Sequence, residues 1–209
     1  HLLFADLALK QTAEDAAVIP PHDALIVDEA HQVEAVATSF FGQAASSAMV
    51  SALCRDCLKP PSLGGDAQAR TLVDHVEVKG QDLFHLLRAR MHAMSATASA
   101  AEAPTAGGRR PGARVRLDEP PLAARGMVKP YHAVDSALDA LKIFLARRAG
   151  SDEDLIHLGR RVGRLRHALT LFSEPPDEDS ILWMERGPRS LSLHSAPVEV
   201  GPVLASTLL

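Results

Sequence analysis

Asp28, Glu29 and His31 are the residues of this sequence best suited to chemistry, and they stand directly after a short apolar run. Continuous apolarity over residues 24–27 indicates a strand buried on both faces, as in a parallel α/β sheet. A carboxylate at the carboxyl end of such a strand lies where open α/β sheets bind their ligands. Asp28 is suited to holding Mg²⁺, usually through water, and Glu29 to deprotonating a water that attacks a phosphoanhydride. His31 is near enough to relay the presence of nucleotide to a neighbouring element.

Two other interpretations of these residues stay open. In the first, Asp28 and Glu29 form an acidic helix start that accepts hydrogen bonds from the free N–H groups of a first turn. In the second, a metallohydrolase site uses His22, Asp23, Asp28 and His31, although the sequence has no H-E-x-x-H or comparable helical ligand pair. The preceding apolar run favours phosphoanhydride hydrolysis.

The elements predicted around this string are α/β in type. A short helix is expected over residues 1–10, followed by a polar stretch with helix breakers over 11–23. After the strand, apolar residues at helical spacing predict a helix that begins near Val33 and ends near Gly42.

The middle of the chain is predicted to be helical. Helices are expected over residues 48–58 and 66–97, the second with an apolar stripe interrupted at Gly80, which we interpret as a kink. Residues 93–113 are rich in Ala, Ser, Thr, Gly and Pro, so they bury too little apolar surface to offset their ordering entropy and are expected to be mobile. Residues 114–117 are expected to form one strand of a small hairpin.

Two further helices are predicted to pack as an antiparallel hairpin. Apolar residues step by three and four along residues 131–145 and again along 155–172, which is the spacing of helices that pack along a partner. Gly150 suits the end of the first helix, and Ser151 with Asp154 has the spacing of a capping box for the second.

The predicted fold class is therefore mainly α, with a helical insertion of antiparallel helices attached to a small, partial α/β segment with few strands. Residues 181–185 and 191–194 are expected to be two strands joined by a turn, and 198–209 a last short helix. The chain thus leaves an α/β layer, forms a helical module and rejoins the layer.

Composition is that of an ordinary globular protein. The 209 residues are 46% hydrophobic and only 4% aromatic, which excludes a disulfide scaffold or a disordered chain and favours helices packed through aliphatic side chains. The sequence has neither a run of about 18 apolar residues nor a basic leader, so we expect a soluble cytoplasmic protein without a membrane partner. Cys54 and Cys57 are too few for a disulfide framework.

The formal net charge of −4 conceals a division along the chain. Residues 60–170 hold 17 Lys and Arg against 12 Asp and Glu, whereas the remaining residues hold 5 against 14. Such a basic middle is suited to a polyanion, although surface helices also vary in charge for no functional reason. Arg160, Arg161 and Arg164 lie away from the apolar seam of their helix and are candidates for phosphate contacts with a single strand; a solvated face is the alternative.

The string Asp28-Glu29-Ala30-His31 after an apolar strand resembles the DEAH form of Walker B in superfamily 2 nucleic-acid helicases. The segments HLLFADLAL at the start, DALIVDEAH, and ILWMERGP followed by APVEVGPVLASTL near the end resemble the bacterial DinG and XPD-like branch. In that branch an all-helical Arch domain is inserted in the first motor domain after Walker B. The resemblance therefore implies a partial motor domain over 1–43, an Arch-like domain over 44–180 and a return to the motor domain over 181–209.

The resemblance implies an ATP-dependent DNA helicase, with a role in DNA repair, that acts on single-stranded or forked DNA. ATP and Mg²⁺ are the implied cofactors, with Asp28 and Glu29 at the metal, Glu29 as the catalytic base and His31 coupling nucleotide state to motion. In this branch the Arch and the first motor domain border the passage for single-stranded DNA.

Several features of the family are missing from these 209 residues. No G-x-x-x-x-G-K-[ST] loop is present to cradle phosphates, so we expect the isolated chain not to hydrolyse ATP. In the family, the iron–sulfur cysteines precede the segment found here, so the resemblance leaves room for a cluster upstream and implies none in this chain. Cys54 and Cys57 are interpreted as two cysteines one turn apart on a helix. A helical protein-interaction module from a non-motor relative is the alternative to a helicase.

Overall fold

A computed structural model describes residues 19–20, 26, 28–33, 36–37, 40, 42–98, 113–175 and 180–198. The chain divides into two compact units. The first consists of His1–Gln43, Glu178–Ile181 and Ser195–Leu209, and the second, here called the helical unit, of Ala44–Asp177 and Leu182–His194.

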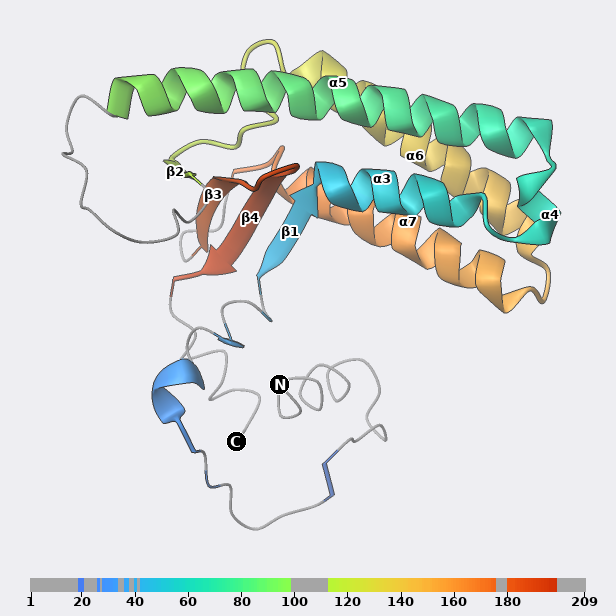
Figure 1. The fold of residues 1–209 in the computed structure, drawn as a ribbon, viewed down its shortest axis with the longest axis horizontal. Coiled ribbons are helices and arrows are strands. Elements are labelled where there is room, and N and C mark those ends of the chain that lie inside the picture. Colours follow the sequence, from blue (N-terminus) through green and yellow to red (C-terminus); the bar gives the residue numbers. More distant parts are fainter. Residues whose placement is uncertain are drawn as a thin grey trace. The chain divides into compact units, whose positions relative to one another are not determined.

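The helical unit is built from long helices and a small sheet (Figure 1). Its helices are α3 (Ser47–Cys57), α4 (Pro61–Gly64), α5 (Ala67–Ala98), α6 (Val128–Ala149) and α7 (Glu153–Leu171). The strands are β1 (Gln43–Ser46), β2 (Arg114–Leu117), β3 (Ser180–Arg186) and β4 (Leu191–Pro197), in the sheet order β1-β4-β3-β2. The mainly helical class with a small strand component is confirmed.

The hairpin of α6 and α7 is confirmed. The predicted seam is buried along both helices, including Leu138 in α6 and Val162 in α7, each with no exposed surface. Gly150 ends α6 with a φ of 48°, in the left-handed region that a residue without a Cβ adopts at least cost. The predicted cap at Ser151 is wrong by one residue, because the Asp152 carboxylate accepts the Asp154 and Leu155 N–H groups at 3.0 and 3.3 Å.

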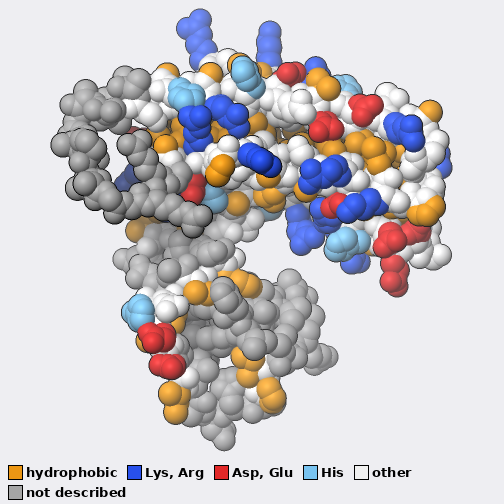
Figure 2. All heavy atoms as spheres, viewed as in Figure 1, with side chains coloured by type: hydrophobic (Ala, Val, Ile, Leu, Met, Phe, Trp, Pro, Cys, Tyr) orange, Lys and Arg blue, Asp and Glu red, His pale blue; other side chains and the backbone are white. Residues whose placement is uncertain are grey.

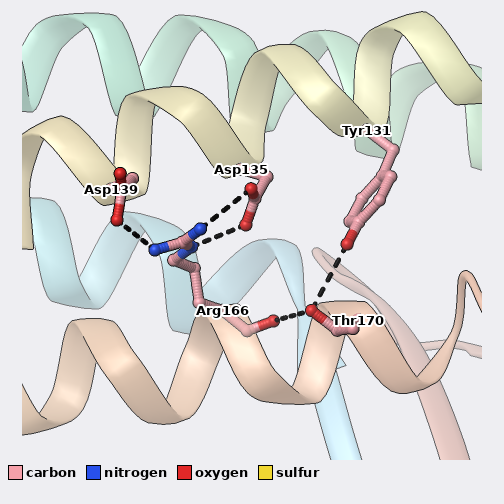
Figure 3. Close-up of polar contacts among 5 residues, drawn as sticks. All are labelled: Tyr131, Asp135, Asp139, Arg166 and Thr170. Carbon is pink, nitrogen blue, oxygen red and sulfur yellow. Dashed lines mark hydrogen bonds and ion pairs between the residues drawn. The ribbon is translucent and has the colours of Figure 1, made fainter.

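Charged side chains of both signs are spread over the surface of the helices (Figure 2), and several pair between elements. Arg166 on α7 reaches α6, where its Nε and Nη2 donate to the two carboxylate oxygens of Asp135 at 2.6 and 3.0 Å and its Nη1 donates to Asp139 (Figure 3). Tyr131 Oη donates to Thr170 Oγ1 at 3.3 Å in the same interface. These contacts fix the register of the hairpin beyond what its apolar seam requires.

Helices α3 and α5 are confirmed. Helix α5 continues without a break through Gly80, the position interpreted as a kink, to Ala98. A Cβ at position 80 would lie 2.7 Å from Cγ1 of Val50 in α3, so the missing side chain serves a close approach of two helices.

The mobile segment predicted over 93–113 overlaps the helix predicted over 66–97, and in the overlap the helix is confirmed, since α5 continues to Ala98. Helix propensity and the packing of the preceding turns outweigh the composition of this stretch. The described residues do not include 99–112, so the rest of the predicted mobile segment lies outside them. The helices predicted over 1–10 and 198–209 also lie outside them, apart from Val198, which is in a bend after β4.

The predicted strands over 114–117, 181–185 and 191–194 are confirmed, with a pairing that the local pattern did not indicate. Strand β2 pairs antiparallel with β3, in the register Arg114 to Glu185 and Leu117 to Leu182. Alternate side chains of β3 and β4 point into the core with those of the helices. Residues 182–194, which the sequence assigns to the returning motor segment, thus complete the core of the helical unit.

Candidate functional site

The Asp-Glu-Ala-His string forms an exposed turn in the first unit. Its last two residues open a short 3-10 helix, η1 (Ala30–Gln32), and the Gln32 N–H donates to the Glu29 carbonyl at 2.9 Å. The Asp28 carboxylate accepts the Glu29 N–H at 2.9 Å. The carboxylate of Glu29 lies 3.2 Å from His31 Nδ1, and these side chains are 65% and 71% exposed. The turn therefore brings the side chains of Glu29 and His31 together, while the Asp28 carboxylate accepts a backbone N–H of the same turn.

Glu29 has a left-handed backbone, with φ 52° and ψ 43°. Such a conformation costs a residue with a Cβ on the order of 1 kcal/mol or more, and it recurs at functional turns. Glu29 occupies the N-cap position of η1 but makes no side-chain hydrogen bond to it. The helix-start interpretation is therefore not supported at Glu29, whose side chain is left to face solvent and His31.

The buried strand predicted over 24–27 is wrong at Ile26, the residue of that run that the structure describes. Ile26 is 95% exposed and not in a strand. A strand buried on both faces needs neighbouring strands for its backbone groups and helices over both faces. The sheet found among the described residues consists of β1 to β4 and does not include Ile26. The helix after the string agrees with prediction at its described positions, which are Val33, Val36, Ala37 and Phe40.

Asp28 and Glu29 fit the oxygen ligands that Mg²⁺ prefers, since both carboxylates are exposed and adjacent. Among the described residues no group of three or more His, Cys, Asp or Glu side chains is placed to hold a metal ion. His22 and Asp23, the further ligands of the metallohydrolase interpretation, lie outside the described residues. Two carboxylates can nevertheless suffice for a cation that retains most of its waters.

The three arginines predicted to contact a single strand do not share one environment. Arg161 pairs with Asp56 of α3 at 2.7 Å and is about 30% exposed, so it joins α7 to α3. Two hydrogen bonds lower the pKa of Asp56 from its ordinary 3.8 to about 2. The one from Lys59 has the larger effect and the one from Arg161 the next largest. Arg160 and Arg164 are exposed, and neither has an ion-pair partner in the described part of the chain.

Cys54 and Cys57 are core residues, as interpreted from the sequence. They are 1% and 0% exposed, and the Cys54 thiol donates to the Val73 carbonyl at 3.7 Å. Burial raises the pKa of Cys54 to about 12 and that of Cys57 to about 11. Because metals and electrophiles require the thiolate, this environment disfavours both ligation and reactivity.

A tryptophan between two apolar strand residues, here Leu182 and Met184, is most often buried in the core. Trp183 is not. It is half-buried on the face of β3 opposite those two residues, and its ring stacks on His194 at 5.0 Å between centroids. Alternation along the strand is the sequence signal that separates these faces.

No helix among the described residues has the length and apolarity needed to cross a membrane.

No family model matches the chain. The chain is nevertheless similar in sequence to an ATP-dependent DNA helicase. The chain is 26% identical over 211 aligned residues to the ATP-dependent DNA helicase YoaA of Haemophilus influenzae. The match covers 100% of this chain and 29% of that protein, so the chain spans less than a third of its relative.

Proposed function

We propose that this chain is a segment of an ATP-dependent DNA helicase of the DinG and XPD-like branch. The observation that carries the proposal is the likeness to a DNA helicase along the whole chain. The exposed Asp-Glu-Ala-His turn supports it, because a helicase needs carboxylates that reach nucleotide and water. In this proposal residues 1–43 are part of the first motor domain, 44–180 an Arch-like domain and 181–209 the return, of which residues 182–194 pack with the Arch-like domain.

The proposed chemistry uses the three side chains of the turn. Asp28, with Glu29 beside it, would hold Mg²⁺, which supplies charge stabilisation to the phosphates when bound. Glu29 orients the attacking water and accepts its proton. His31 contacts Glu29 at 3.2 Å and is therefore suited to report on the occupancy of the site to a neighbouring element.

The helical unit is proposed to border the path of single-stranded or forked DNA. Arg160 and Arg164 support this placement because they are exposed cations without an acidic partner among the described residues. Arg161 is excluded from the set because Asp56 already engages it.

The test of the proposal is Glu29→Gln in the full-length protein. Without a base to accept the proton of water, DNA-stimulated ATP turnover should fall by about 10²-fold or more, while ATP binding is retained. Glu119→Gln is the matched control, since Glu119 is exposed and lies in the helical unit. An unchanged kcat in Glu29→Gln would refute the assigned role.

The proposal also predicts that the 209-residue chain does not hydrolyse ATP by itself, because its sequence has no Walker A loop. Measurable hydrolysis by this chain would contradict that prediction. A full-length protein that is folded and binds DNA but hydrolyses no ATP would favour the non-motor interaction module instead.

A further inference from the structure

An open groove of about 580 Å³ lies between α3 and α5, and Arg189 of the turn between β3 and β4 also lines it. Helix α3 lies along α5 (Figure 1), and the face that they form carries several clusters of Lys and Arg side chains (Figure 2). The groove has arginines from three elements, Arg55 on α3, Arg88 on α5 and Arg189 in the strand turn. All of its lining residues belong to the helical unit.

The arginines of this groove have no acidic partner among the described residues, whereas several others of the helical unit do. Arg148, Arg161 and Arg166 are each held by an aspartate. In contrast, the described residues provide no ion pair to Arg55, Arg88 or Arg189, and Asp82 is the one carboxylate that lines the groove. The groove thus carries an excess of positive charge that the unit itself does not neutralise.

Arg88 is the partly buried arginine of the groove. Its Nε atom is buried and has no hydrogen-bond partner in the described part of the chain, and the same holds for Arg90, which does not line the groove. Because the buried Nε is out of reach of an anion in the open groove, such an anion would pair with the terminal nitrogens of the Arg88 guanidinium.

Several features favour phosphate groups along a strand over a single small anion. Guanidinium groups pair with phosphate oxygens in a planar, two-point geometry. The groove includes Ser47 and Ala48 of the first turn of α3, at the positive end of the helix dipole, where Ser46 Oγ already accepts the Met49 N–H. On the other side of α5 a second groove shares Asp82 and His85 with the first and adds Lys79 and Lys129. The cationic groups therefore continue across α5 toward α6.

A positively charged groove that follows one backbone is the way in which proteins commonly bind single strands. We propose that the groove between α3 and α5 binds the phosphate backbone of a single-stranded nucleic acid, with Arg55, Arg88 and Arg189 contacting phosphates. This inference rests on the proposed function for the choice of polyanion, but it assigns the strand to a surface other than the α7 arginines.

The test measures the binding of a fluorescent single strand of about 20 thymidines to the 209-residue chain by anisotropy. The key variant is Arg55→Glu with Arg189→Glu, because both side chains are exposed and reversing them should not disturb the core. Each phosphate contact to a single strand adds about 0.7 to the salt slope, which is the slope of log affinity against log salt concentration. At about 50 mM salt, one such contact therefore corresponds to a roughly tenfold gain in affinity. The variant should therefore bind about 100-fold more weakly, with a salt slope lower by about 1.4.

The matched control is Arg125→Glu with Arg147→Glu, which makes the same change in net charge on exposed residues outside the groove. Its affinity should change by less than about threefold, since screening limits long-range effects. Arg88→Lys should weaken binding while retaining charge, because an ammonium group cannot make the two-point contact. Urea midpoints of all variants confirm that each chain is folded.

The outcomes separate this inference from the proposed function. Equal affinity of the Arg55 and Arg189 variant and the wild type would refute the groove while leaving the helicase proposal intact. Equal loss of affinity in the control would show that net charge alone matters and would also refute the groove, as would equally tight binding of a duplex. A chain that binds no single strand at low salt refutes the groove, and the helicase proposal is then judged by ATP turnover of the full-length Glu29→Gln variant.

Discussion

Replacing Gly80 by alanine tests the close approach of α3 and α5. In an exposed helix interior, glycine to alanine stabilises by about 1 kcal/mol, because alanine loses less backbone entropy on folding. At position 80 the new Cβ would lie 2.7 Å from Cγ1 and 3.5 Å from Cβ of Val50, whereas carbon atoms in contact prefer about 3.5–4.0 Å. Val50 is 2% exposed, and its β-branched side chain has essentially one rotamer in a helix, so the helices must separate.

Overpacking of this kind costs about 1–3 kcal/mol. Set against the gain in helix propensity, Gly80→Ala should leave the free energy of unfolding between roughly unchanged and about 2 kcal/mol lower. Gly159→Ala is the matched control, because Gly159 is inside α7 and an added Cβ there meets nothing within 4 Å. That variant should be about 1 kcal/mol more stable than the wild type.

The assay is urea unfolding of the 209-residue chain, followed by circular dichroism of the helices. The two glycine variants should shift the midpoint in opposite directions, or at least differ by about 1–3 kcal/mol. Val50→Ala should lower stability in the wild type but cost at least about 1 kcal/mol less in the Gly80→Ala background, since the clash is then removed. If Gly80→Ala stabilises as much as Gly159→Ala, the reasoning about this contact is refuted.

Three further predictions concern charge and burial. Arg166→Ala should lower the free energy of unfolding by about 1–2 kcal/mol in urea melts, because it breaks the bridge to α6, whereas exposed Arg160→Ala should stay within about 0.5 kcal/mol; equal effects would contradict the bridge. Hydrogen bonds from Lys59 and Arg161 lower the folded pKa of Asp56 to about 2, so their stabilisation is present above pH 3.8 and lost as pH falls through about 2. Asp56→Asn should make the urea midpoint less sensitive to pH between about 2 and 3.8. An unchanged pH profile would count against this role of Asp56. The two buried cysteines should react with a thiol reagent at pH 8 only on unfolding, with pKa values of about 12 and 11, and fast labelling of the folded chain would disprove their burial.

Local pattern was sufficient to predict the helices and their buried faces. In the α6 and α7 hairpin, the three-and-four spacing of Leu138, Val162 and their neighbours determines which face is apolar, and helical geometry then requires those faces to pack. Even there the N-cap was displaced from Ser151 to Asp152, because either side chain can cap a helix and the turn geometry decides between them.

Contacts between distant residues were beyond local pattern. Gly80 reads as a kink along its own helix, and its role becomes apparent only beside Val50, thirty positions earlier. Arg161 belongs to a cationic helix face in sequence but is engaged by Asp56 in space. The groove arginines Arg55, Arg88 and Arg189 come from three elements and share no spacing that a sequence pattern could detect.

The sequence by itself determined the mainly helical class, the periodic faces of the helices, and the adjacent carboxylates and histidine on which the proposed chemistry depends. These are properties of neighbouring residues, for which bond geometry and helix periodicity set the separation. Only the tertiary structure decided which cations are neutralised, which cysteines are buried and where a glycine permits two helices to approach. Pairing across the chain depends on how the apolar faces pack, and side chains far apart in sequence meet only once that packing is set.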